Sequence, residues 1–279
     1  MSQSDNIKDI INLLQGLDQE TTFNLFIPSL QKEVPFKQLT TEQLKRILKT
    51  VVDSPVYNTE FIKTFNSIIK ENSLDKEVNV DNLTIFDKTL LLFKTKIESI
   101  SPDFVFTFTD EEIRNNDLSD KTVTINLETR LNKFLEKNIN FEPQIIEFNN
   151  NTVTCNLPTL YTENKLEHEL HKNVKIEVNT PEELRTIVGE TFINEVTKFI
   201  TNININGSEV DLLKLTFKNR ISVVENLPTQ IINKVIKYIE NYRETLKELL
   251  VHKASIQTKE QTLVVIEKEI PVDASLFNM

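Results

Sequence analysis

Residues 23–48 read FNLFIPSLQKEVPFKQLTTEQLKRIL, and residues 83–101 read LTIFDKTLLLFKTKIESIS. The first stretch begins with two short β-prone runs, 23–27 and 34–36, separated by a turn that starts at Pro28. This pattern predicts a small hairpin. Both stretches then change to the three- and four-residue spacing of apolar side chains that is typical of helices. We therefore expect the rest of the chain to be organised around this part.

Three amphipathic helices are predicted after the hairpin. Thr40 and Gln43 have the spacing of a capping box at the start of the first helix, and Thr84 and Asp87 have it at the start of the third. The third helix has the widest apolar face, so we expect it to be the most buried. The apolar positions are Leu44, Ile47, Leu48 and Val51 in the first helix, Phe61, Phe65, Ile68 and Ile69 in the second, and Phe86, Leu90, Leu91, Leu92, Phe93, Ile97 and Ile100 in the third.

The composition excludes several classes of protein. A chain of 279 residues with 39% hydrophobic residues is long and apolar enough for a packed core. The net charge of -10 argues against nucleic acid as a partner, because phosphate binding needs clustered Lys and Arg. No apolar run approaches the roughly 20 residues that cross a bilayer, and the first residues lack a signal-peptide profile. The sequence therefore predicts a cytoplasmic protein without a membrane partner.

Residue types that carry common chemistry are scarce. Cys155 is the only cysteine, so one chain forms no internal disulfide and no multi-cysteine metal site. Three glycines are too few for the glycine-rich motifs that hold nucleotides or expose a nucleophilic serine. We expect no cofactor and no enzymatic activity.

The apolar pattern changes after Ser101 from helical to mixed. Alternation predicts strands at 104–108 and 123–125, a helix over 127–135, and a hairpin of 145–148 with 152–156. The sequence thus predicts an α+β fold with an N-terminal β-hairpin plus a helical part, followed by mixed strands and amphipathic helices, a long C-terminal helix and a closing hairpin. We expect a hairpin and helical domain at 1–101 and an α+β domain at 102–279, with the alternative that both share one core.

Two long helices are predicted in the second half. Thr180, Pro181 and Glu183 form the clearest helix start in the chain, and apolar residues continue to Phe199. A further helix runs from about 228 to 251, with a seam that includes Ile239, Tyr242 and Leu246. Such a seam packs either on an internal helix or on a copy of itself in a homo-oligomer.

Two terminal segments are candidate partner contacts. Ile7, Ile11 and Leu14 share one face of a short N-terminal amphipathic segment, which packs either on its own domain or on a neighbouring subunit. Leu276 and Phe277 are large apolar residues at a position where chains usually fray, so they are buried either in the core or in a partner's pocket.

The segment 162–171 holds the densest group of titratable residues, including His168 and His171. Their spacing on a helix gives a metal-dependent hydrolase as one alternative. However, HELH is not the HExxH zinc motif, and no third ligand has a matching spacing. We therefore expect a solvent-exposed helix face here.

Three short motifs carry a family resemblance. Pro28-Ser29-Leu30-Gln31-Lys32-Glu33-Val34-Pro35-Phe36 is similar to the pattern P-S-x-G-K-x-V-x-F, and the residues from Leu83 to Asp87 are similar to L-x-x-F-D before an apolar helix. Lys96 to Ile100 lie where the pattern R-x-x-S-V-G is expected, and the chain ends in a large apolar pair. The chain resembles the T4-type bacteriophage baseplate hub proteins, the family typified by the gene 26 product. Gln31, Lys96 and Ser101 depart from the pattern, in which glycine, arginine and glycine are usual.

The resemblance implies a structural or assembly component of a contractile-tail baseplate hub. Its partners would be other phage baseplate or tail proteins, and it would be made as a late protein in the host cytoplasm before joining the virion. A transient tail assembly chaperone, absent from the finished virion, is an alternative with the same sequence features. A cellular regulator with an amphipathic binding arm is another.

Overall fold

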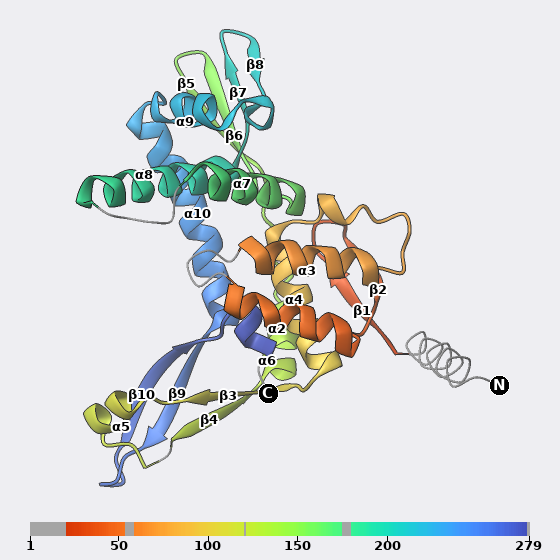
Figure 1. The fold of residues 1–279 in the computed structure, drawn as a ribbon, viewed down its shortest axis with the longest axis vertical. Helices are drawn as coiled ribbons and strands as arrows, with labels where there is room; N and C mark the ends of the chain where they lie inside the picture. The colour runs from red at the N-terminus through yellow and green to blue at the C-terminus, as the bar shows by residue number, and fades with distance from the viewer. Residues whose placement is uncertain (1–20, 54–58, 120, 175–179, 278–279) are drawn as a thin grey trace, which may run out of the picture.

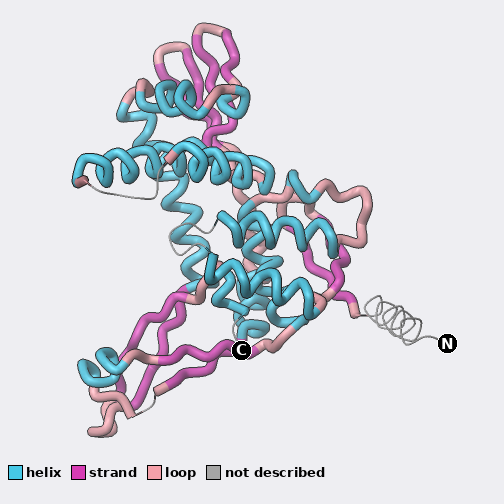
Figure 2. The backbone as a smooth tube through the Cα atoms, in the orientation of Figure 1, coloured by secondary structure: helices cyan, strands magenta, loops and turns pink. Residues whose placement is uncertain are grey.

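The computed structural model describes residues 21–53, 59–119, 121–174 and 180–277. The predicted N-terminal segment with Ile7, Ile11 and Leu14 lies outside these residues. A helical body occupies the middle of the molecule (Figure 1), and two extensions leave it on one side. The upper extension combines a sheet with helices, and the lower one consists mainly of strands (Figure 2). The long helix α10 runs between the two extensions (Figure 1).

The predicted N-terminal hairpin is confirmed. Its strands pair antiparallel and bring Phe23 opposite Phe36 and Leu25 opposite Val34, and all four side chains are buried. Gln31 makes the turn with a φ of 52°, and its Nε2 donates to the carbonyl of Pro28 at 2.7 Å. This side-chain bond holds a left-handed conformation that glycine would adopt without strain. The strands are β1 (Thr22–Ile27) and β2 (Lys32–Lys37).

The three predicted helices of the body are also confirmed. The capping box at Thr40 and Gln43 forms, with reciprocal bonds of 3.1 and 3.2 Å, and so does the box at Thr84 and Asp87. Ten of the fifteen residues of α4 are buried, which confirms it as the most buried helix of the three. The elements are α2 (Thr41–Asp53), α3 (Thr59–Asn72), the 3-10 turn η1 (Val80–Asn82) and α4 (Ile85–Ser99).

The lower extension consists of two antiparallel ribbons, each of two strands. They pack together through a small apolar cluster of Phe108, Leu118, Ala254 and Ile256. The short helix α5 was not predicted, although Thr109 and Glu112 form a capping box at its start. The elements are β3 (Asp103–Thr107), α5 (Asp110–Asn116), β4 (Thr122–Asn126), β9 (Val251–Gln257) and β10 (Leu263–Glu269).

The upper extension is built on an antiparallel sheet of order β5-β6-β7-β8. Its tight turns use residues with positive φ, namely Asn149, Asn150, Asn206 and Gly207, as their types predict. Residues 210–217 contain the end of one strand, a 3-10 turn and the start of a helix. The elements are β5 (Gln144–Phe148), β6 (Asn151–Cys155), α7 (Leu160–Asn173), α8 (Pro181–Lys198), β7 (Ile200–Ile205), β8 (Ser208–Val210), η2 (Leu212–Lys214) and α9 (Phe217–Glu225).

The main apolar cluster reaches from β1 to the last described residues. It includes side chains from both sides of Ser101, so the body and the upper sheet contribute to one core. The remaining elements, which also contribute to it, are α6 (Leu127–Leu135), α10 (Thr229–Leu250) and η3 (Ala274–Phe277). The α+β class is confirmed, with its N-terminal hairpin, its long C-terminal helix and its closing hairpin of β9 and β10.

Candidate functional site

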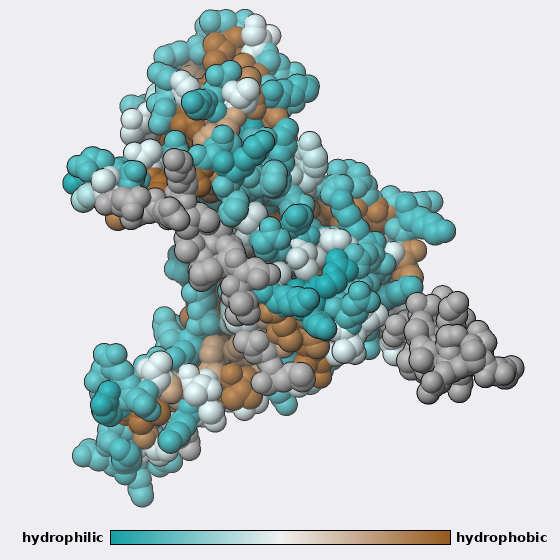
Figure 3. Space-filling view, viewed as in Figure 1, coloured by the Kyte–Doolittle hydropathy of each residue, from teal (hydrophilic) through white to brown (hydrophobic). Residues whose placement is uncertain are grey.

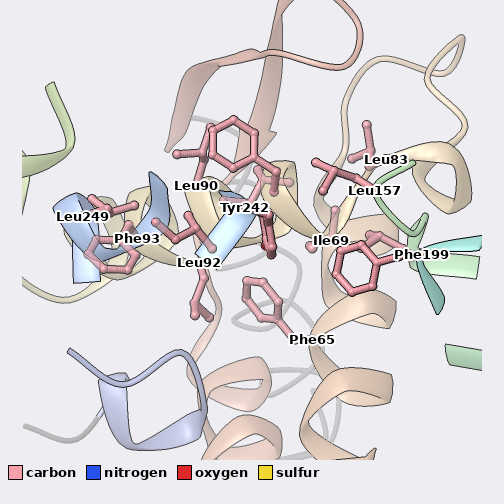
Figure 4. Packing of buried hydrophobic residues seen from close by; sticks show 14 of the residues in the cluster. Phe65, Ile69, Leu83, Leu90, Leu92, Phe93, Leu157, Phe199, Tyr242 and Leu249 are labelled. Atoms are coloured by element: carbon pink, nitrogen blue, oxygen red, sulfur yellow. The ribbon is translucent and has the colours of Figure 1, made fainter. Parts of the chain in front are cut away.

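The predicted seam of the long helix faces the interior. Ile239, Tyr242 and Leu246 are all buried in the main cluster. The ring of Tyr242 meets that of Phe141 edge-on at a centroid distance of 5.4 Å, and it lies among Leu90 and other core side chains (Figure 4). The seam therefore packs inside its own chain and not on a copy of itself.

The C-terminal apolar pair is also internal. Leu276 and Phe277 have no exposed surface, and the ring of Phe277 lies 6.1 Å from that of Phe65 on α3. Their burial places η3 against the helical body. The fold therefore assigns all five of these described candidates to the core, and a partner-binding surface has to be sought elsewhere.

The titratable residues of segment 162–171, on α7, form ion pairs with neighbouring helices. Glu163 accepts from Lys88 of α4 at 2.5 and 2.6 Å, and Glu167 pairs with Lys198 of α8. Both glutamates are buried, so the expectation of a wholly solvent-exposed face is wrong for them. The reason is that lysines from neighbouring helices bring the compensating charges, which local spacing does not reveal.

The two histidines of α7 do not gather a ligand set. His168 is exposed, and Glu169 next to it pairs with Arg220 of α9 at 2.7 Å. Within the part of the chain that the structure describes, no three residues of His, Cys, Asp and Glu are placed to hold a metal ion. The arrangement on α7 is therefore one of ion pairs between packed helices.

Two further reactive side chains, Lys198 and Cys155, are buried in the packed interior. Burial favours the neutral form of Lys198, but the carboxylates of Glu195 and Glu167 outweigh it and raise the pKa of this ammonium group. Burial raises the pKa of the Cys155 thiol to about 12. Since the thiolate is the reactive form, Cys155 is a poor nucleophile at neutral pH.

The motif residue Asp87 connects the hairpin to α4. It is fully buried, and its Oδ1 accepts from the backbone N–H of Ser29 at 3.2 Å. Its Oδ2 accepts from both the N–H and the hydroxyl of Thr84 at 2.7 Å. The two motifs around Ser29 and Asp87 are thus parts of one contact, and their role is to fix the fold.

One face of α8 is apolar and uncovered. Leu184, Val188 and Phe192 follow one another at four-residue steps and are 51%, 60% and 47% exposed. On a helix these positions form one stripe about 12 Å long. The start of α8 projects beyond the rest of the upper extension (Figure 1). Large apolar side chains gathered in this way mark interaction surfaces.

A different part of α8 packs inside the protein. Ile187 and Ile193 lie against a small cluster of Leu170, Val174 and residues of α9. The sequence indicated one amphipathic helix and missed the second apolar face. A signal was present, because the apolar residues from Leu184 to Val196 spread over about two thirds of the circumference of an ideal helix. Packing against one internal cluster covers a smaller part of the circumference of the helix.

Comparison with known families decides the class of protein. The sequence pattern of the family described as "T4 bacteriophage base plate protein" matches residues 19–265. The chain belongs to the T4 bacteriophage base plate protein family. The match includes the hairpin, α4 and α8, so the body and the upper extension of this baseplate protein both lie within it.

Comparisons with individual proteins give no further match for this baseplate protein. No curated protein and no solved structure matches the chain. Among the described residues, none of the helices combines the length and the apolar composition of a membrane span. The family assignment therefore rests on the sequence pattern.

Proposed function

We propose that this baseplate protein is a structural or assembly component of the hub of a contractile-tail baseplate. Membership of the baseplate family supports a role in the baseplate. The resemblance of residues 28–36 and 83–87 to the gene 26 product family supports a place in its hub. Its activity would be binding to other baseplate or tail proteins, without catalysis and without a cofactor. It would be made in the host cytoplasm and then join the tail.

The uncovered stripe on α8 carries this proposal. Leu184, Val188 and Phe192 keep about half of their surface in water, while the residues next to them on the helix already have an internal contact. Burying three such side chains in a protein partner is favourable at roughly 25 cal/mol per Å² of apolar surface. A helix that lays an apolar face into a groove is a common mode of protein recognition. The partner would be another protein of the baseplate.

Affinity purification from infected cells tests the proposal. The full chain with an affinity tag would be expressed during infection and recovered under mild conditions. We expect baseplate hub or tail proteins to co-purify in constant ratios. Recovery of the chain without any tail protein, or with a stoichiometric small molecule or nucleic acid instead, would contradict the proposal.

A transient assembly chaperone is the second candidate function. The exposed stripe on α8 fits it equally, because a chaperone has to bind tail proteins and then release them. Quantitative mass spectrometry of purified virions separates the two roles. A hub component is expected at a fixed number of copies per particle, whereas a chaperone is present in infected cells and absent from virions.

A further inference from the structure

Lys96 is a buried lysine that pairs with none of the residues that the structure describes. It lies near the end of α4, and only 2% of its surface is exposed. Among the described residues, no hydrogen bond or ion pair reaches its ammonium group, whereas Lys88 and Lys94 of the same helix each pair with a glutamate. Burial lowers the pKa of Lys96, and no neighbouring carboxylate compensates. Burial of a charge without a counter-charge costs free energy, so a ligand that brings a counter-charge to Lys96 would be favoured there.

The side chain of Lys96 lines a cavity at the junction of three parts of the chain. The cavity has a volume of about 730 Å³. Ile100 continues its wall from α4, Phe104 and Val105 come from β3, and Pro271 comes from the C-terminal segment. Apolar surface is gathered where the two ribbons leave the helical body (Figure 3). The cavity thus combines apolar walls with one positive charge.

The wall formed by β3 is an open strand edge. In the described chain β3 pairs with β4 alone, so the backbone groups on its other side have no strand partner. Phe104 on one face of the strand and Val105 and Thr107 on the other all line the cavity, which therefore runs along the edge. An edge of this kind accepts an added strand.

The polar groups around the cavity do not neutralise Lys96. Asp103 also lines it, and its carboxylate accepts from Asn126 at 3.4 Å. The hydroxyl of Ser275 donates to Asp273 at 2.5 Å. Within the described parts of the chain, none of the carboxylates forms an ion pair with Lys96.

We propose that an extended segment of another baseplate protein adds a strand to the free edge of β3 and places an Asp or Glu side chain on Lys96. This inference rests on the proposed function, because it takes the partner from the baseplate. A protein segment fits better than a small free acid, since it uses the strand edge and the apolar walls as well as the charge. Main-chain bonds to β3 supply affinity, and the carboxylate supplies specificity.

Peptide selection on the full chain tests the proposal. A displayed library of random seven-residue peptides is selected on the wild-type protein, and the enriched peptides are synthesised with a fluorophore. We expect them to carry one Asp or Glu between β-prone residues. Replacing that acid by its amide is expected to weaken binding about tenfold or more, as measured by fluorescence anisotropy. Enrichment of peptides without an acid would overturn the proposal.

Two lysine variants locate the effect. Lys96→Met is expected to weaken binding of the acidic peptides by the same factor, whereas Lys94→Met, two residues away on the same helix, is expected to leave it unchanged. Equal binding to wild type and Lys96→Met would overturn the proposal. Sodium acetate at the peptide's concentration should not displace the peptide. Displacement would show a site for free carboxylates and would also overturn it.

Two measurements separate lost binding from lost folding. Removing an unpaired buried charge is expected to raise the Tm of Lys96→Met by about 2–4 °C. In the wild-type protein, bound peptide is expected to protect the amides of β3 from hydrogen exchange, and unchanged exchange there would overturn the proposal without any variant. If the full chain recovers baseplate proteins from infected cells but these peptide results fail, only the cavity assignment falls and the proposed function stands.

Discussion

The helices α4 and α8 begin with the same capping motif but differ in how far their apolar residues are buried. Thr84 with Asp87 and Thr180 with Glu183 both form complete capping boxes. On α4, however, Leu90 is fully buried, whereas Val188 on α8 is 60% exposed. Local sequence thus starts both helices in the same way, and the fold decides what covers them.

The difference comes from how much of each helix its neighbours bury, which is ten of the fifteen residues of α4 and four of the eighteen of α8. α4 contacts β1, α6 and α7, so nearly every apolar residue on it meets another side chain. α8 contacts α7, α9, α10 and β7, and its outer stripe of Leu184, Val188 and Phe192 still keeps about half of its surface in water. We infer that α4 holds the fold together and that α8 offers the surface for a partner.

Thiol labelling gives the largest contrast between the two regions. Burial moves the pKa of Cys155 from 9.0 to about 12, which lowers its thiolate fraction at pH 8 about 1,000-fold. A cysteine introduced on the exposed stripe by Val188→Cys should keep an ordinary pKa. With an excess of iodoacetamide at pH 8, we expect the new cysteine to react at least about 1,000 times faster than Cys155 in the same molecule. Mass spectrometry of the two tryptic peptides measures both rates.

Comparable rates for the two cysteines would show that the core around β6 opens readily, and the contrast between the core and α8 would then be lost. Denatured protein is the control, because both thiols should react at similar rates in it.

Shortening an apolar side chain gives the next contrast. Leu90→Ala leaves a cavity in the middle of the core and is expected to lower the free energy of unfolding by about 2–5 kcal/mol. Val188→Ala removes side-chain atoms that are already in water, so its effect should stay within about 0.5 kcal/mol. Urea unfolding followed by circular dichroism measures both. Equal losses would mean that the stripe on α8 is covered within the chain.

The two capping boxes give the smallest contrast. Asn at position 87 would turn an N–H₂ group toward the N–H groups of Ser29 or Thr84, which already donate to the carboxylate. We therefore expect Asp87→Asn to lower the free energy of unfolding by about 2–3 kcal/mol. Glu183→Gln keeps an acceptor at an exposed helix start and should change it by less than about 0.5 kcal/mol. A similar loss for both variants would contradict the link between the hairpin and α4.

Local signals in the sequence were sufficient for the elements. Capping boxes located the starts of α2, α4 and α8, and the alternation of apolar residues located the hairpin of β5 and β6. The short helix α5 was missed because its seven residues, none of them buried, have no apolar face to reveal it. Elements with an apolar pattern or a specific turn residue are thus predictable from sequence.

The surroundings of charged residues were not predictable in the same way. Glu163 is buried because Lys88, which lies 75 positions earlier in the chain, meets it. Lys96 is buried without such a partner in the described part of the chain, and its neighbours in sequence do not show this. The same limit applies to the stripe on α8, because exposure depends on which elements pack nearby. Contacts between distant segments decide these features.

A competition for assembly tests the central claim most directly. Wild-type chain and a triple variant with Leu184→Gln, Val188→Gln and Phe192→Gln would be expressed together during infection, in a host where no other copy is made. Glutamine is a good helix former, so α8 and the Tm should be preserved. We predict that the share of the variant in purified baseplates is less than about a tenth of its share in the lysate. Equal shares in the baseplates and the lysate would contradict the account.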